Sequence, residues 1–437
     1  MATVTYAIDG ERNDAFAEQT GGVRAGVLPR GVRGAADPSF ALAVQAFSRL
    51  FGPRRFGGGA LTVYLDGVPV VDVWTGWADR AGRRRWSADT GAMVFSATKG
   101  LASTVIHRLV DRGLVDYEAP VAEYWPEFGA RGKGAITVRD VMRHRAGLSQ
   151  LNGVTMADLL DHVRMEERIA AAPPGLLRGR PAYHALTYGW LVSGLARSVT
   201  GLGMRELFRT ELARPLDVDG IHLGRPPVSA PTRPAQIIGP QRHLQNPIVN
   251  LLTPRLAALP VSGGLGALYF PGMKSVVQGE TPLLDGEMAS ANGVSTARGL
   301  ARVYGAIANG GEIDGTRFLS GSVVAGLTGP RSLHPDGSLG MPMSFHLGYH
   351  GLPLPGVLPG FGHVGLGGSL GWADPAAGLA FGYVHNRLLT PLVVADQAGF
   401  VAMAALIRRG AARARQRGFA AVPRFGAGSA GPAATAV

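Results

Sequence analysis

Apolar residues recur along this chain with two different periods, which separate regions of strands from a region of helices. Strand-like runs over residues 61–65 and 68–77 flank Asp66-Gly67, a pair that suits the tight turn of a β-hairpin. Further strands are expected near the other end of the chain, ahead of a closing helix over residues 392–409. These later strands are predicted at residues 345–349, 362–372 and 378–386.

The segment between these strands shows the 3.6-residue period of helices. Residues 96–112 place one apolar stripe on a predicted helix, formed by Leu101, Val105, Ile106, Leu109 and Val110. A capping pattern from Thr137 to Asp140 starts another helix, and residues 295–298 start one that ends at Asn309-Gly310-Gly311. A first helix is expected over residues 38–50.

Strands at both ends and helices in the middle predict an α+β protein. Its antiparallel sheet would be built from both chain ends with flanking helices, and a mostly helical lobe would be inserted between them. The expected divisions are an extended N-terminal lead-in, an α/β lobe in two segments, a helical lobe with loops, and a disordered tail. They cover residues 1–38, 39–95 with 345–417, 96–344, and 418–437 respectively.

Composition narrows the class of protein. Of the 437 residues, 46% are hydrophobic and 17% charged, which is typical of a globular protein. The chain has no cysteine, so disulfides, thiolate zinc sites and cysteine nucleophiles are excluded. The N-terminal residues lack the pattern of a secretory signal, and no run approaches 18 uninterrupted apolar residues. We therefore expect a cytoplasmic protein without membrane insertion.

The formal net charge of +12 raises the question of nucleic-acid binding. The arginines are dispersed, and no helix-turn-helix, zinc-finger or RNP pattern accompanies their densest cluster, so a solvated helix end explains it better. That cluster is Arg408, Arg409, Arg413, Arg415 and Arg417. The 11 histidines form no HExxH motif and no compact group with carboxylates. We expect no nucleic-acid partner, no metal and no cofactor.

Ser96 and Lys99 open the predicted helix in a Ser-x-x-Lys pattern. Side chains three residues apart on a helix point in the same direction, within reach of each other. A serine hydroxyl needs a base to take its proton, and a lysine amine can do so when burial keeps it neutral. The helix N-terminus can also donate a backbone N–H to a developing oxyanion. The alternative is an exposed lysine in a first helical turn.

Lysine is rare in this chain. Its three lysines are Lys99, Lys133 and Lys274, so 40 of the 43 basic residues are arginine. A guanidinium cannot act as a base near neutral pH, whereas an ammonium can lose its proton. A lysine at the one position where base chemistry requires it strengthens the catalytic interpretation.

Three further segments come after Ser96 and Lys99 in the chain, in the order that a Ser-x-x-Lys hydrolase would have them. They are His144-Arg-Ala-Gly147-Leu148, Tyr183-His-Ala185-Leu-Thr-Tyr188, and Gly362-His363-Val364-Gly365-Leu366. Together the four resemble the serine β-lactamase and penicillin-binding-protein superfamily. The greatest similarity is to its class C-like branch, the family VIII carboxylesterases and related amidases, transesterases and D-aminopeptidases. The resemblance covers residues 40–410 and implies the β-lactamase/transpeptidase-like fold.

By this resemblance Ser96 is the acylated nucleophile and Lys99 is its base. Tyr183 resembles the tyrosine of the family's Tyr-x-Asn motif, which carries the proton to the leaving group. A phenol would need a neighbouring cation such as Lys99 to act as a base. Tyr188 is the competing tyrosine and matches a packing position. The alternative for Tyr183 is an ordinary buried tyrosine with a satisfied hydroxyl.

The resemblance also implies an oxyanion hole and a substrate-binding set. The oxyanion hole would be the backbone N–H groups of Ser96 and Leu366. The substrate-binding set is His363, Val364, Gly365, Ala185 and Asn292. His144 and Gly147 match a turn, and we interpret them as local structure.

Two positions depart from the family pattern. Ala185 stands where the motif has asparagine, and His363 stands where β-lactamases have the lysine of Lys-Thr-Gly. The first change removes an amide partner for a substrate's acylamino group. The second weakens the anchor for a substrate carboxylate, because a histidine is mostly neutral. Both favour a neutral ester over a penicillin or a peptide. The alternative for His363 is a strand histidine packed at the cleft edge.

A competing motif surrounds Ser369, because residues 367–371 fit the Gly-x-Ser-x-Gly pattern of α/β-hydrolases. That motif requires a strand, a sharp turn and a helix, followed by an acid and a histidine. Here a turn and another strand follow. The only downstream histidine is His385, with Asp374 and Asp396 as candidate acids. We interpret these glycines as room for substrate.

The leading hypothesis is therefore a serine hydrolase that cleaves a small-molecule carboxylic ester through an acyl-enzyme. An acyltransferase on the same scaffold is the alternative, in which an alcohol or amine replaces water. Amidase or β-lactam hydrolysis ranks third. A catalytically silent binding protein is the hypothesis from a different class.

Overall fold

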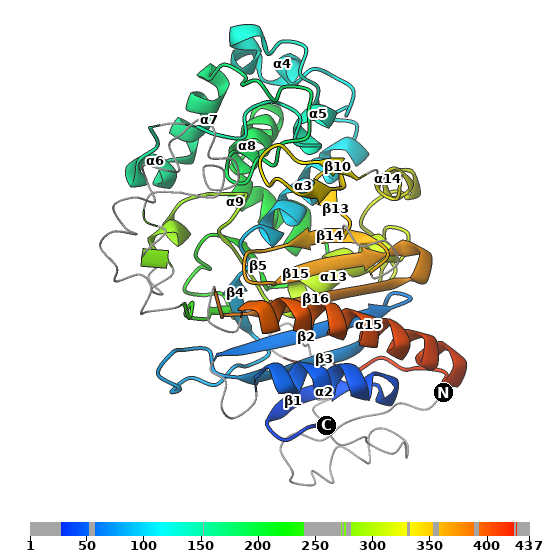
Figure 1. Ribbon diagram of the computed structural model, residues 1–437. Coiled ribbons are helices and arrows are strands. Elements are labelled where there is room, and N and C mark those ends of the chain that lie inside the picture. Colours follow the sequence, from blue (N-terminus) through cyan, green and yellow to red (C-terminus); the bar gives the residue numbers. More distant parts are fainter. Residues whose placement is uncertain are drawn as a thin grey trace, which may run out of the picture.

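The computed structural model describes the central chain with several gaps. The described residues are 28–51, 57–151, 153–239, 272, 275–276, 281–329, 333–352, 358–388, 393–423 and 425. An eight-stranded antiparallel sheet in the order β1-β3-β2-β16-β15-β14-β13-β12 is its centre (Figure 1). Its strands are β1 (Val32–Ala36), β2 (Gly58–Leu65), β3 (Val68–Gly76), β12 (Phe345–His346), β13 (Tyr349–His350), β14 (Phe361–Val364), β15 (Leu370–Asp374) and β16 (Leu379–His385).

The N-terminal and C-terminal groups of strands join where β2 pairs with β16. The predicted hairpin joins β2 to β3, and Asp66 and Gly67 have φ angles of 50° and 76°, as a primed turn requires. The expected sheet from both chain ends is thus confirmed.

Helices cover both faces of the sheet. On one face lie η1 (Pro38–Phe40), α2 (Ala41–Leu50) and α15 (Val393–Arg417), with Phe47 and Ile407 in a shared apolar core (Figure 1). On the other, α13 (Ala297–Ala308) packs against β2, β15 and β16. The close approach of α13 requires a glycine at position 382, because a Cβ there would lie 2.3 Å from the Ala297 carbonyl oxygen.

The middle of the chain forms the expected helical lobe around α3 (Ala97–Asp111) and α8 (Thr187–Thr200). Shorter elements surround them: α4 (Val121–Tyr124), η2 (Pro126–Gly132), α5 (Val138–Met142), α6 (Met156–Leu160), α7 (His162–Ala171), α9 (Met204–Leu207), the π-helical η3 (Phe208–Ala213), η5 (Pro282–Asp285) and α14 (Gly321–Leu327). The predicted capping box of Thr137 and Asp140 starts α5, and Thr296 caps α13.

Small strands also lie in this middle region. A four-stranded sheet has the order β5-β7-β4-β6. Its members are β5 (Ile221–Leu223), β7 (Gly293–Ser295), β4 (Thr90–Met93) and β6 (Arg233–Pro234). Short pairs are formed by β8 (Glu312–Ile313) with β9 (Thr316–Arg317), and by β10 (His334–Pro335) with β11 (Pro342–Met343). A single 3₁₀ turn, η6 (Pro375–Ala377), joins β15 to β16.

Two predicted strands are corrected. Residues 362–372 form the hairpin β14–β15 rather than one strand, because Gly367 and Gly368 adopt φ angles of 98° and 109° and reverse the chain. Residues 345–349 are split between β12 and β13 by a turn at Leu347 and Gly348.

The chain ends also differ in part from expectation. The predicted lead-in contains β1, which pairs with β3 as an edge of the sheet. The first described residues of the predicted disordered tail are packed: the Val422 N–H donates to the Pro69 carbonyl, and the Phe425 ring lies 5.3 Å from that of Trp74. A backbone hydrogen bond and an aromatic contact hold this segment. No helix in the described ranges is long and apolar enough to cross a membrane.

Candidate active site

Ser96 sits at the start of α3, immediately after a strained residue. Phe95 has a φ of 47°, a left-handed conformation that non-glycine residues seldom adopt. This turn leads from β4 into α3, with Ser96 as the N-cap residue. Its side chain makes no capping bond to the helix, so the hydroxyl is left for other partners.

Lys99 lies in the first turn of α3 and reaches back to Ser96. Its Nζ is 3.2 Å from the Ser96 Oγ and 2.8 Å from the Ser290 carbonyl oxygen. The lysine side chain is fully buried, and burial lowers its pKa well below the ordinary 10.5. A neutral amine can donate one hydrogen to Ser290 and still accept the Ser96 proton.

The loop that carries Ser290 is held by Asn292. Both amide hydrogens of Asn292 are donated, to the Leu283 and Gly286 carbonyls, and its Oδ1 accepts the Met288 N–H. The sequence predicted a substrate contact for Asn292; its amide is instead taken up inside the loop. Its role in the geometry is to present the Ser290 carbonyl to Lys99.

Tyr183 approaches Ser96 from the segment that precedes α8. Burial raises the pKa of Tyr183 above its ordinary value of 10.0, and a smaller interaction with the Ser96 side chain opposes that rise. The ring stacks on Phe345 at 5.4 Å, and Lys99 Nζ lies 5.1 Å from its centre. Ser96, Lys99 and Tyr183 are thus brought together, with Tyr183 as a neutral phenol.

Asp336 holds the backbone of Tyr183 and was not predicted from the sequence. Its Oδ1 accepts the Tyr183 N–H at 3.1 Å, together with the N–H groups of Ser338 and Leu339. The carboxylate is buried. Asp336-Gly337 is a turn signal in the sequence, but nothing there indicates the contact with a residue 153 positions earlier.

The remaining predicted residues of this segment serve as packing. Tyr188 bonds the Ser103 hydroxyl at 2.6 Å, and Ser103 in turn donates to the Lys99 carbonyl. Ala185 is buried in a small apolar cluster with Tyr183. His144 accepts the His184 N–H on its Nδ1 and the Ala182 N–H on its carbonyl. His144 therefore fixes the backbone on both sides of Tyr183.

The end of β14 completes the site. A Cβ on Gly365 would lie 2.0 Å from the Val94 carbonyl oxygen, so this strand end abuts the segment that leads to Ser96. In the described part of the chain, the backbone N–H groups of Ser96 and Leu366 donate no hydrogen bond. Both N–H groups are thus available to a ligand, and the oxyanion hole that they would form stays a prediction.

His363 lies on β14, and its ring centre is 6.2 Å from that of Tyr183. The side chain is buried, with Nδ1 3.1 Å from the Val364 carbonyl oxygen. Burial holds the pKa of His363 well below 6.5. The Val364 N–H donates to Nε2 of His350. Residue 363 therefore supplies a neutral ring where β-lactamases have a cation.

The competing Ser369 is not arranged as a nucleophile. Its hydroxyl bonds the backbone of His385, accepting from the N–H at 3.2 Å. The His385 ring is occupied elsewhere, because Nε2 lies 3.0 Å from the Gly367 carbonyl and Nδ1 accepts the Arg387 N–H. Asp374 caps η6 and pairs with Arg408. The side chain of Asp396 lies outside the described residues.

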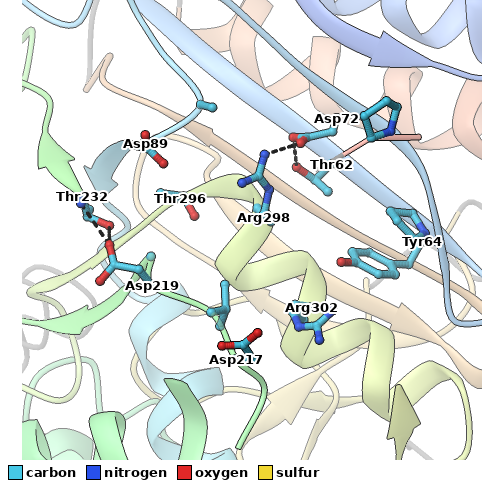
Figure 2. A pocket seen from close by; sticks show the side chains of 15 residues that line it. Thr62, Tyr64, Asp72, Asp89, Asp217, Asp219, Thr232, Thr296, Arg298 and Arg302 are labelled. Atoms are coloured by element: carbon cyan, nitrogen blue, oxygen red, sulfur yellow. Dashed lines mark hydrogen bonds and ion pairs between the residues drawn. The ribbon is translucent and has the colours of Figure 1, made fainter. Parts of the chain in front are cut away.

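A separate cavity of about 40 Å³ lies beside the first turn of α13 (Figure 2). Two of its carboxylates are bonded within the wall: Asp72 binds Arg298 at 2.5 Å and Thr62 at 3.1 Å, and Asp219 accepts from Thr232. Neither Ser96 nor Lys99 lines it. Over the described ranges, no three acidic or histidine side chains gather as metal ligands.

The sequence is similar to those of known proteins. A model of the Beta-lactamase family matches residues 43–405. The esterase/β-lactamase LipL of Mycobacterium tuberculosis is 65% identical over 408 residues, which cover 93% of this chain and 95% of LipL.

Solved structures agree. A penicillin-binding-protein homologue from Caulobacter crescentus is 29% identical with a TM-score of 0.74, over 87% of this chain and 99% of that one. A family VIII carboxylesterase is 32% identical with a TM-score of 0.72, over 85% of this chain and 99% of the carboxylesterase. The chain belongs to the Beta-lactamase family, with the β-lactamase/transpeptidase-like fold. It is a serine hydrolase of the esterase/β-lactamase type.

Proposed function

We propose that this enzyme hydrolyses carboxylic esters through an acyl-enzyme on Ser96. The observation that carries the proposal is the buried Lys99 amine 3.2 Å from the Ser96 hydroxyl, and burial lowers the pKa of that amine, which favours its neutral form. The Ser96 oxygen attacks the ester carbonyl carbon while its proton passes to Lys99. The resulting oxyanion accepts hydrogen bonds from the backbone N–H groups of Ser96 and Leu366.

Lys99 and Tyr183 take different proton-transfer roles because their pKa values are shifted in opposite directions. The Lys99 pKa is lowered and the Tyr183 pKa is raised, so the amine is the base and the phenol the proton donor. These are the roles that the family resemblance implies, with Lys99 as the base and Tyr183 as the proton carrier to the leaving group. Tyr183 hands its proton to the departing alcohol and regains one from Lys99. Water then attacks the acyl carbonyl while Lys99 takes one of its protons, and that proton passes to the Ser96 oxygen as it leaves the acyl group.

An ester is the favoured substrate for two structural reasons. Ala185 has no amide to bind an acylamino group, and the neutral His363 ring offers no cation to a carboxylate. Esters also have better leaving groups than amides. The names of two relatives, an esterase/β-lactamase and a carboxylesterase, support the same class.

Acyl transfer to an alcohol or amine is the second candidate. Lys99 is fully buried and Tyr183 is 6% exposed, so the proton carriers are shielded from bulk water. A site that excludes water can keep an acyl-enzyme long enough for another acceptor to react.

A fluorophosphonate, which labels active serines, tests the proposal. We expect wild-type enzyme and Ser369→Ala to take the label, and Ser96→Ala to lose both label and turnover while remaining folded. Offering an acyl ester with and without an added alcohol then separates hydrolysis from transfer by the products formed. A label that is lost with Ser369 and kept with Ser96 replaced would overturn the assignment.

A further inference from the structure

The tautomer of His363 is fixed by its own strand. Its Nδ1 lies 3.1 Å from the Val364 carbonyl oxygen, which can only accept a hydrogen bond. Nδ1 therefore carries the hydrogen, and the neutral ring has its lone pair on Nε2. The sequence predicted that this residue touches substrate, but not which kind of group it would offer.

That lone pair has no donor. Nε2 of His363 is buried and has no hydrogen-bond partner in the described part of the chain. The neighbouring His350 cannot supply a hydrogen from its Nε2, because that atom accepts the Val364 N–H at 3.1 Å. A buried acceptor without a donor is destabilising, and a ligand that brings a donor removes the penalty.

His363 lies beside the residues that surround Ser96. Its ring centre is 6.2 Å from that of Tyr183, whose own ring centre is 5.1 Å from Lys99 Nζ. The residue stands three positions before Leu366, the predicted oxyanion donor, on the strand that abuts Val94. A Cβ on Gly100, next to Lys99, would lie 3.3 Å from the His363 Cβ, so the base of this side chain packs against the first turn of α3.

We propose that Nε2 of His363 accepts a hydrogen bond from a hydroxyl group of the substrate, so that the preferred substrates are neutral hydroxyl-bearing esters. This proposal rests on the ester hydrolysis proposed above. A carboxylate at the same point would have no hydrogen to offer the Nε2 lone pair and would be buried against it without a partner. A hydroxyl donates its hydrogen and needs no counter-charge.

Matched esters test the proposal. On the acyl side, p-nitrophenyl 3-hydroxybutyrate is compared with p-nitrophenyl butyrate and p-nitrophenyl hydrogen glutarate. On the alcohol side, glycerol monobutyrate is compared with propyl butyrate by release of butyrate. We expect one of the two hydroxyl esters to exceed its plain partner about tenfold in kcat/KM, and the glutarate to be the poorest substrate.

Variants of His363 assign the preference to Nε2. His363→Phe keeps a ring without an acceptor and should bring the hydroxyl-to-plain ratio near one. His363→Gln keeps an acceptor and should restore part of that ratio, while His363→Lys should raise the glutarate ester relative to the butyrate.

Two outcomes oppose the proposal. An equal ratio in wild type and His363→Phe, or a wild-type preference for the glutarate, overturns it. If His363→Phe does not fold, the wild-type ratios and His363→Gln still decide. Loss of all ester turnover in wild type, or turnover that survives Ser96→Ala, would instead reject the proposed function, so the two failures are distinguishable.

Discussion

Replacing Lys99 by arginine or methionine separates its charge from its basicity. Arginine keeps a cation that cannot give up its proton, and methionine keeps the length without any proton to exchange. If the neutral amine 3.2 Å from Ser96 is the base, both changes should remove it. General-base catalysis contributes roughly a hundred- to ten-thousandfold, or about 2.7–5.4 kcal/mol of barrier, so kcat should fall by that factor in each variant.

The two variants should differ in stability. Lys99 is fully buried and its side chain meets one protein carbonyl, that of Ser290. Arginine would bury a permanent charge with too few acceptors and should lower the melting temperature, whereas methionine should not. The assay combines steady-state hydrolysis of p-nitrophenyl butyrate with thermal melts followed by circular dichroism.

Lys133 provides a matched control for this pair. It is also fully buried, but its Nζ donates to three carbonyls, those of Ala130, Ala170 and Ala172, at 2.6–2.8 Å. Lys133→Met should therefore destabilise the fold by leaving carbonyls unpaired, with little change in kcat per folded molecule. A Lys99→Arg enzyme near full activity would refute the neutral-lysine mechanism.

Four further outcomes are expected. Tyr183→Phe should lower kcat by about a hundredfold or more, and Tyr188→Phe far less, because the Tyr183 hydroxyl interacts with Ser96 whereas that of Tyr188 bonds Ser103. Asp336→Asn, which keeps an acceptor for the Tyr183 N–H, should retain far more activity than Asp336→Ala, with kcat changed more than KM. Because folding lowers the Lys99 pKa, its contribution to stability should rise with pH up to 10.5, and Lys99→Met should show a shallower slope in urea titrations, with the remainder from groups such as Lys133 whose pKa is also lowered. Finally, p-nitrophenyl acyl esters should be hydrolysed measurably and penicillins little or not at all.

Each outcome has a clear opposite. Equal losses of kcat in Tyr183→Phe and Tyr188→Phe would show that Tyr183 is not the proton donor. Equal activity of the two Asp336 variants would show that the carboxylate does not position Tyr183. A Lys99→Met protein with the wild-type pH slope would place the buried titration elsewhere. Efficient penicillin turnover with poor esters would show that residues 185 and 363 do not control specificity.

Local signals explain what the sequence predicted well. Ser96 and Lys99 meet because three-residue spacing on a helix brings them together whatever surrounds it. Asp66-Gly67 fixes its hairpin in the same way. The capping box at Thr137 likewise needs only residues within one helical turn.

Long-range satisfaction of polar groups explains what the sequence missed. Asn292 resembles a pocket residue by type, yet its own loop uses all its amide hydrogens. Lys99 bonds the backbone carbonyl of Ser290, 191 residues later in the chain. Any residue has this carbonyl, so the residue type at position 290 could not predict the contact. The strand predicted over residues 362–372 was too long because glycine fits both an extended strand and a tight turn. The residue types therefore did not show that the chain reverses at Gly367 and Gly368.

The pairing of β2 with β16 has a consequence for how the enzyme comes into being. The Asn386 side chain, just beyond β16, bonds the Gly58 N–H 328 residues earlier in the chain. One neighbour of β2 in the sheet is therefore synthesised more than 300 residues later, and such high contact order slows folding. During synthesis Ser96 and Lys99 emerge long before Leu366. A nascent chain therefore carries its nucleophile and base without the strand that supplies the second oxyanion donor, and we expect catalysis to begin only after β14–β16 have left the ribosome and joined the sheet.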